Sequence, residues 1–171
     1  QGVSEEPTIV TDDTSKTYTW ALNDIPPYTT EASMPAYGDI VPRLEAGIFS
    51  DYEYLFDWLS KLQEDRMNIT PDIRDIVNEI TSEFSKMEDK IAAIYYFVQR
   101  EIEYISIKGS LSSNITGHPA QFTLENKYGD CTDKSILMST MFRALGLNAR
   151  PIILMTNDEE TIDRSLPCTH R

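Results

Sequence analysis

The sequence predicts an α+β fold for this chain of 171 residues. Residues 1–50 combine a short run of β-forming residues with a stretch interrupted by prolines. Apolar residues then recur at helical spacing between residues 50 and 105, and again between residues 136 and 145. A short apolar run of strand type, residues 151–155, follows the last predicted helix.

The first 50 residues are expected to be extended. Residues 17–22 alternate weakly and are rich in β-formers, which is typical of a strand. Four prolines between residues 26 and 42 remove backbone donors and favour extended geometry. Because one or two strands cannot stand alone, we interpret residues 1–45 as the last strand or strands of something upstream, followed by a proline-rich connector. Residues 46–171 then form the second domain.

Three helices are predicted between residues 50 and 105. Ser and Glu at positions 50 and 53 fit a capping box, and residues 85–88 fit a second one. Residues 70–72, Thr-Pro-Asp, are typical of a helix start. The apolar faces of the three helices are expected to form the core: Leu55, Trp58, Leu59 and Leu62; Ile73, Ile76, Val77, Ile80 and Phe84; Ile91, Ile94, Tyr95, Val98, Ile102 and Ile105.

The segment after these helices is predicted to be a loop, a short helix and a longer helix. Residues 106–119 lose all periodicity, and a loop of this length in a compact domain usually has a use. Ala120 to Asn126 can form one or two helical turns. The last helix begins at Asp130 or Cys131, and Gly146 fits the position just after its end. Its core residues are predicted to be Ile136, Leu137, Thr140, Met141 and Leu145.

The charge balance restricts the partners that the chain can have. Fifteen Lys and Arg against 28 Asp and Glu give a formal net charge of −13. Because phosphate binding needs a basic patch, we expect no nucleic-acid partner, and an anionic membrane surface is disfavoured for the same reason. No apolar run is long enough to cross a membrane, so no membrane insertion is expected.

Cys131 lies where a turn becomes a helix. Unpaired N–H groups at a helix start, together with the helix dipole, favour the thiolate. The backbone N–H of Cys131 can also donate to the oxygen of an acyl group that its sulfur attacks. Gly129 permits a close approach, and Asp130 can cap the helix although its charge opposes the thiolate. Asp133 is favourable in the first helical turn.

Other roles for this cysteine stay open at this point. Most lone cysteines are small buried hydrophobes, and catalysis needs a base, usually histidine. The two histidines are His118, in the predicted loop, and His170, near the end, and neither is favoured by its context. A redox role would need a resolving thiol, which only Cys168 could supply. The spacing of cysteines and histidines fits no metal site, and no cofactor is implied.

Three segments in order carry a resemblance to a known family. Residues 96–104 are YFVQREIEY, residues 126–134 are NKYGDCTDK, and residues 142–151 are FRALGLNARP. Over residues 50–167 the chain resembles bacterial members of the transglutaminase-like superfamily, whose domains share a papain-like cysteine hydrolase arrangement. Gly-Asp-Cys-x-Asp-Lys is the specific part, and Thr132 stands where lysine is usual.

The resemblance implies a papain-like core with a helical subdomain and the start of an antiparallel sheet, and Cys131 as nucleophile. It also implies that residues 1–45 are the remnant of a β-domain that precedes this core in the same full-length chain. In similar proteins a histidine base follows a Leu-Pro by a few residues, and an aspartate lies on a later strand. Here Leu166-Pro167 is followed by four residues. We therefore expect the domain to be truncated, its histidine and aspartate to lie beyond Arg171, and the segment alone to be inactive. Supporting residues of the site are Tyr128, Gly129, Asp130, Asp133 and His118.

The function that the resemblance implies is thiol acyl transfer on protein or peptide amides. Cys131 attacks a carbonyl, a downstream histidine protonates the leaving amine, and water or an amine then resolves the thioester. Hydrolysis and cross-linking both stay open, and the alternative is a non-catalytic binding or scaffold module of the same fold. Similar bacterial proteins are often exported to the cell envelope, which favours a periplasmic or secreted location over a cytoplasmic one.

Overall fold

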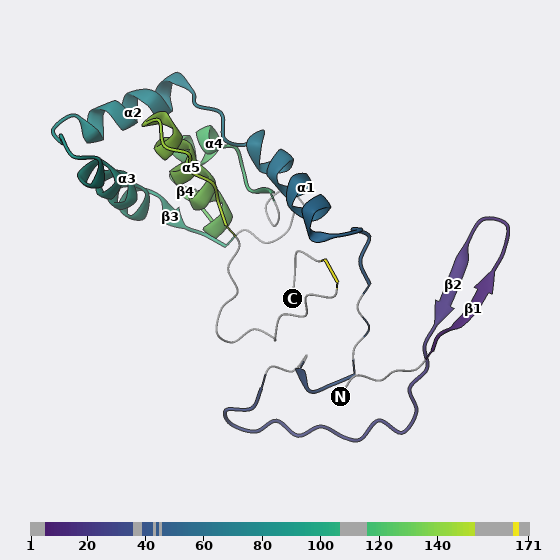
Figure 1. Cartoon of the computed structure of the whole chain (residues 1–171). Helices are drawn as coiled ribbons and strands as arrows, with labels where there is room; N and C mark the ends of the chain where they lie inside the picture. Colours follow the sequence, from purple (N-terminus) through teal and green to yellow (C-terminus); the bar gives the residue numbers. More distant parts are fainter. Residues whose placement is uncertain are drawn as a thin grey trace. The chain divides into compact units, whose positions relative to one another are not determined.

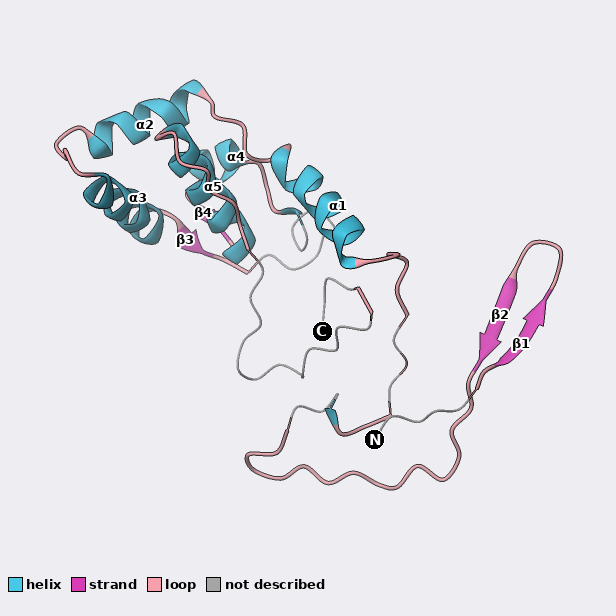
Figure 2. Ribbon diagram, in the orientation of Figure 1, coloured by secondary structure: helices cyan, strands magenta, loops and turns pink. Residues whose placement is uncertain are grey.

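The computed structural model describes residues 6–35, 39–42, 44, 46–106, 116–152 and 166–167. Within these residues it is an α+β structure with five α-helices and two small sheets, which confirms the predicted fold class (Figures 1 and 2). The chain divides into two compact units, one of residues 1–48 with 155–171 and one of residues 49–154. The helices and the predicted site belong to the second unit.

The first unit contains an antiparallel hairpin of strands β1 (Thr8–Thr11) and β2 (Lys16–Thr19). The predicted strand at residues 17–22 is thus shorter and begins one residue earlier, and its partner strand was not predicted. Every residue of both strands is exposed. Asp12 closes the turn, because its side chain accepts the backbone N–H groups of Thr14 and Ser15. That the hairpin is the remnant of a β-domain stays a prediction.

The second unit begins with helices α1 (Tyr52–Glu64), α2 (Pro71–Thr81) and α3 (Met87–Glu101). The cap of α2 is confirmed: the Thr70 side chain accepts the N–H of Ile73, and Pro71 is the first helical residue. The other two caps were predicted wrongly. Helix α1 is capped by Asp51, whose carboxylate accepts the N–H of Tyr54 at 2.7 Å and is a stronger acceptor than a hydroxyl.

Helix α3 has no side-chain cap. It starts after Lys86, so the predicted capping serine lies outside the helix and Glu88 is only the second helical residue. A capping box needs the glutamate as the third residue of the helix, so Glu88 cannot form one. The helix ends at Glu101, earlier than its apolar pattern suggested, because the chain then enters an extended strand.

The core lies between α2, α3 and the two remaining helices, α4 (Ala120–Asn126) and α5 (Cys131–Ala144). In Figure 1, α5 lies between α3 on one side and α1 on the other. The predicted apolar faces of α2 and α5 are confirmed in their buried members, whereas Phe84, Ile91, Tyr95 and Ile105 are exposed. Residues buried in this core are Met67, Ile73, Val77, Ile94, Val98, Ile102, Ala120, Leu124, Ile136, Leu137 and Met141.

Two very short strands connect α3 with α5. Strand β3 (Glu103–Tyr104) pairs in parallel with β4 (Tyr128–Gly129), and α4 lies between them in the sequence. The end of α4 is a left-handed residue, Lys127 with φ +60°, which turns the chain from the helix into β4. Helix α5 ends as predicted, with Gly146 at φ +87° just after its cap.

Some sequence predictions concern residues that lie wholly or partly outside the described ranges. The loop predicted at residues 106–119 lies mostly outside the described residues, as do three of the five residues of the strand predicted at 151–155. Pro151 and Ile152 are described and are not in a strand. Cys168 and His170 also lie outside the described residues.

Candidate active site

Helix α5 starts with two aspartates that cap it reciprocally. Oδ1 of Asp130 accepts the backbone N–H groups of Thr132 at 2.9 Å and Asp133 at 3.1 Å. In return, Oδ2 of Asp133 accepts the backbone N–H of Asp130 at 3.1 Å. This is a capping box built from two carboxylates, and it fixes the backbone on both sides of Cys131. Both aspartates are buried, with 6% and 1% of their surface exposed.

Gly129 makes room for this arrangement. A Cβ at this position would lie 2.5 Å from Cβ of Asp133 and 3.1 Å from its Oδ2. The group that comes close to Gly129 in the described structure is therefore the Asp133 side chain. Any larger residue would push the carboxylate out of reach of the Asp130 N–H, since atoms essentially never approach so closely.

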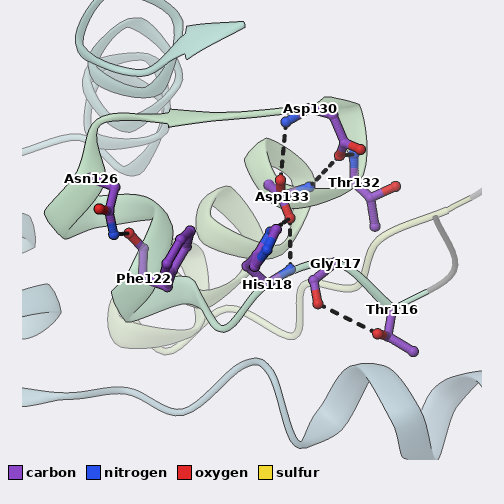
Figure 3. Close-up of polar contacts among 8 residues, drawn as sticks. All are labelled: Thr116, Gly117, His118, Phe122, Asn126, Asp130, Thr132 and Asp133. Carbon is purple, nitrogen blue, oxygen red and sulfur yellow. Dashed lines mark hydrogen bonds and ion pairs between the residues drawn. The ribbon is translucent and has the colours of Figure 1, made fainter. Parts of the chain in front are cut away.

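Asp133 also anchors the segment that precedes α4. The backbone N–H of His118 donates to Oδ1 of Asp133 at 2.6 Å, and Nδ1 of the same histidine lies 3.1 Å from that oxygen (Figure 3). The imidazole stacks on Phe122 with 4.5 Å between ring centroids. Gly117, with φ +65°, lets the chain pass close to the start of α5. His118 is thus tied through one ring nitrogen to a buried carboxylate.

Cys131 is a free cysteine and is exposed, although it is the first residue of a helix whose other face is in the core. Strand β3 brings Tyr104 beside it. Tyr104 lies opposite Gly129 in the β3–β4 pair, and Gly129 precedes Cys131 by two residues. The charge of the Cys131 thiolate form, removal from water and the Asp130 carboxylate all raise the pKa of Tyr104, so the phenol keeps its proton.

Three hydrogen bonds hold the backbone on either side of Tyr104. The N–H of Glu103 donates to the Lys127 carbonyl at 2.8 Å, and that of Ile105 donates to the Gly129 carbonyl at 3.1 Å. From the first turn of α5, Nζ of Lys134 donates to the carbonyl of Ile102 at 2.7 Å. The strand that carries the phenol is therefore attached to both β4 and α5.

The structure brings most of the predicted site residues together. Gly129, Asp130, Asp133 and His118 surround the start of α5. Tyr128 packs its ring edge-on to Phe122 at 6.2 Å between centroids. The one histidine of the described residues is His118, whose ring lies against Asp133 and Phe122.

Three features of the site were not predicted from the sequence: the reciprocal capping box, the place of Tyr104, and the tie between His118 and Asp133. The capping box had a local signal, since two aspartates three residues apart at a helix start resemble the Ser-x-x-Glu pattern. The place of Tyr104 had no local signal in the sequence, because it depends on the pairing of two strands of two residues each. The tie between His118 and Asp133, 15 residues apart, also had no local signal.

Neither a metal cluster nor a membrane span is found in the parts of the chain that the structure describes. No group of three or more His, Cys, Asp or Glu side chains converges there. None of the helices described is long and apolar enough to cross a membrane.

A cavity of about 240 Å³ lies at the other end of α5, lined by residues that include Lys61, Glu64 and Arg143. It is separate from the Cys131 site.

The fold and the site define a class of protein: α+β domains in which an exposed cysteine begins a core helix. A family model described as the transglutaminase-like superfamily matches residues 74–169, more than half of the chain. The chain belongs to the transglutaminase-like superfamily, as its motifs predicted. No curated protein and no solved structure matches it. Bacterial origin stays a prediction.

Proposed function

We propose that the protein of which this chain is part transfers acyl groups from protein or peptide amides through a thioester on Cys131. The observation that supports the proposal most is the position of this cysteine. It is exposed, it is the first residue of α5, and the reciprocal Asp130–Asp133 cap holds its backbone. Membership of the transglutaminase-like superfamily adds the reaction class.

The chemistry that these residues would perform is limited and specific. The Cys131 thiolate attacks the amide carbonyl carbon, a C–S bond forms, and the carbonyl π electrons move to oxygen. The backbone N–H of Cys131 would donate to that oxygen. Collapse restores the carbonyl, breaks the C–N bond and releases the amine with a proton from a general acid. Water or a second amine then attacks the thioester.

The general acid is proposed to be a histidine beyond the described residues, because in the proteins that the chain resembles the base follows the Leu-Pro downstream of the cysteine, whereas His118 precedes it. The location that we infer for the protein is periplasmic or secreted. The alternative function is a non-catalytic module of the same fold, which would keep the structure of α5 without turnover.

The experiment that tests the proposal is alkylation of Cys131 by iodoacetamide as a function of pH, followed by peptide mass. Cys168 of the same chain is the internal reference, and Cys131→Ala supplies the background. We expect Cys131 to react faster than Cys168 below about pH 7, as a thiolate at a helix start does. If Cys131 reacts no faster than Cys168, the nucleophile assignment fails and the module function is favoured.

A further inference from the structure

His118 is a residue of the site for which the proposed reaction has so far no role. It contacts the carboxylate of Asp133 twice: the backbone N–H donates to Oδ1 at 2.6 Å, and Nδ1 of the ring lies 3.1 Å from the same oxygen (Figure 3). Because an ionised carboxylate only accepts hydrogen bonds, Nδ1 carries the proton in this contact. The backbone contact needs no particular side chain, so the ring supplies a donor that the path of the chain alone does not require.

The Asp133 carboxylate needs such a donor because it is removed from water. Only 1% of the surface of Asp133 is exposed. A buried carboxylate is costly unless it is paired and hydrogen-bonded. In the part of the chain that the structure describes, the ion-pair partner of Asp133 is His118, and no Lys or Arg side chain takes this place. The imidazole is therefore the side chain that holds this carboxylate in position.

The position of the carboxylate in turn determines the backbone that leads into Cys131. Oδ2 of Asp133 accepts the N–H of Asp130 at 3.1 Å, and Asp130 directly precedes the cysteine. When Oδ1 is bound to the imidazole, Oδ2 is presented to this N–H. One carboxylate thus connects the ring of His118 with the residue before the nucleophile, at the helix start that favours a thiolate.

The packing around the imidazole keeps this connection in one geometry. A Cβ at Gly117 would lie 3.0 Å from Cγ2 of Thr132 and 3.1 Å from Oδ1 of Asp133, so the chain before α4 lies directly against the first turn of α5. The imidazole also stacks on Phe122, with 4.5 Å between ring centroids and 18° between the ring planes. A ring that is fixed by stacking offers its N–H in one direction, which is the direction of the carboxylate.

We propose that His118 is a positioning residue of the Cys131 site and acts through Asp133 on the backbone before the nucleophile. The inference rests on the proposed function, because it assigns the tie a role in the reactivity of Cys131. With the ring donor present, the carboxylate holds the N–H of Asp130 and the turn before α5 is ordered. Without it, the carboxylate loses one of its hydrogen bonds, the turn loosens, and Cys131 reacts more slowly.

The test removes the two features of the His118 ring one at a time. His118→Asn keeps a side-chain N–H at the place of Nδ1 but removes the ring, and His118→Phe keeps a ring on Phe122 but removes the donor. His118→Ala removes both. The readout is the rate of alkylation of Cys131 by iodoacetamide at about pH 7, where the rate follows the thiolate fraction. This rate is divided by that of Cys168 in the same chain.

Asn126→Ala is the matched control. The Asn126 amide donates to the carbonyl of Phe122 at 2.8 Å within α4 and is exposed, so its loss removes a side-chain hydrogen bond near the ring without reaching Asp133. Urea denaturation of every variant establishes that the folded chain is being measured. If His118→Ala does not fold, the comparison of His118→Asn with His118→Phe carries the test.

We expect His118→Ala and His118→Phe to lower the relative rate of Cys131 roughly three- to ten-fold, the size of a helix-terminus effect on a partly buried charge. His118→Asn should restore the wild-type rate, because it restores the donor, and Asn126→Ala should not change it. A role in stability alone would not give this result. It would lower the free energy of unfolding and leave the rate of the folded chain unchanged.

A second measurement follows the path between the ring and the nucleophile. Hydrogen exchange of the Asp130 amide, measured by NMR, should be faster in His118→Ala and His118→Phe, because the acceptor of this amide is then less firmly held. It should stay at the wild-type rate in His118→Asn. Unchanged exchange in all three variants would show that the ring does not act through Asp133, and the inference would be overturned.

The alkylation rates decide between the other possibilities. If His118→Phe reacts like wild type, or if His118→Asn is as slow as His118→Ala, the ring donor positions nothing and the inference is overturned. Variants that all react as fast as wild type, or faster, overturn it as well. A wild-type chain in which Cys131 reacts no faster than Cys168 overturns the proposed function itself, before His118 is considered.

Discussion

Two turns of this chain are organised by the same interaction in opposite surroundings. In the β1–β2 hairpin, Asp12 accepts the N–H groups of Thr14 and Ser15, each at 2.8 Å. At the start of α5, Asp130 accepts two N–H groups at 2.9 and 3.1 Å. Asp12 is fully exposed, whereas Asp130 is buried. The bonds are alike, and only their access to water differs.

This difference in burial decides how firmly each aspartate holds the backbone of its own turn. When an exposed bond breaks, water replaces the lost partner, so its net contribution is small. When a buried bond breaks, the N–H groups left behind have no partner, and the cost is that of a desolvated polar group. The hairpin turn can therefore open at little cost, whereas the cap of α5 holds the backbone of Cys131 in one arrangement. The predictions below test this comparison.

The largest effect is expected at Asp133, the most buried carboxylate of the site. Asp133→Ala leaves the N–H groups of His118 and Asp130 without their acceptor. We expect a loss of about 3 kcal/mol in the free energy of unfolding, measured by urea denaturation. The control Asp89→Ala, at an exposed position in the first turn of α3, should change stability by about 0.5 kcal/mol. Equal effects of the two variants would contradict the role of burial.

A smaller effect is expected from adding one methyl group at Gly129. Because its Cβ would lie 2.5 Å from Cβ of Asp133, Gly129→Ala must displace the carboxylate. We expect a loss of about 2 kcal/mol and a changed alkylation rate of Cys131. Gly146→Ala is the matched control: it meets nothing within 4 Å and is strained only by its φ of +87°. It should cost about 1 kcal/mol and leave the alkylation rate unchanged. A Gly129→Ala variant as stable as wild type would show that this contact is not tight.

The smallest effect is expected in the hairpin, and it depends on pH. Hydrogen bonds, the first from the backbone of Thr14, lower the pKa of Asp12 from 3.8 to about 2. Since this pKa is lowered by folding, the carboxylate supports the turn above about pH 4 and loses that contribution as the pH falls toward 2. NMR shifts of the Thr14 and Ser15 amides should titrate with a midpoint near 2. A midpoint near 3.8 would mean that the turn is open in solution.

The parts of the fold that local rules determine were predictable from the sequence. Helix α4 has the predicted bounds, and α2 has the predicted cap, because Thr70 and Pro71 act on their own helix. The cap of α1 was misassigned by one residue because Ser50 and Asp51 both satisfy the cap preference. In α3, Ile91 and Tyr95 match the helical period but lie at the edge of the buried face, which periodicity alone cannot separate.

The candidate site was predictable only along its own segment. Cys131 and its two flanking aspartates belong to one continuous motif, and the structure keeps them at the helix start. His118 and Tyr104 come from elsewhere in the sequence, and tertiary contacts bring them in: the bond of His118 to Asp133 and the pairing of Tyr104 with Gly129. No local pattern specifies a parallel pair as short as β3–β4, because two residues cannot establish a period.

The pairing of β3 with β4 has a consequence for the order in which the chain folds. Helices α2 and α3 are neighbours in sequence and can dock early, whereas β3 and β4 join across 25 positions, from residue 103 to residue 128. Contacts over such separations pay their loop-closure entropy before they gain energy, and they form late. A nascent chain would thus carry the thiol of Cys131 for some time without the neighbouring phenol. Folding itself would then be the step that completes the site.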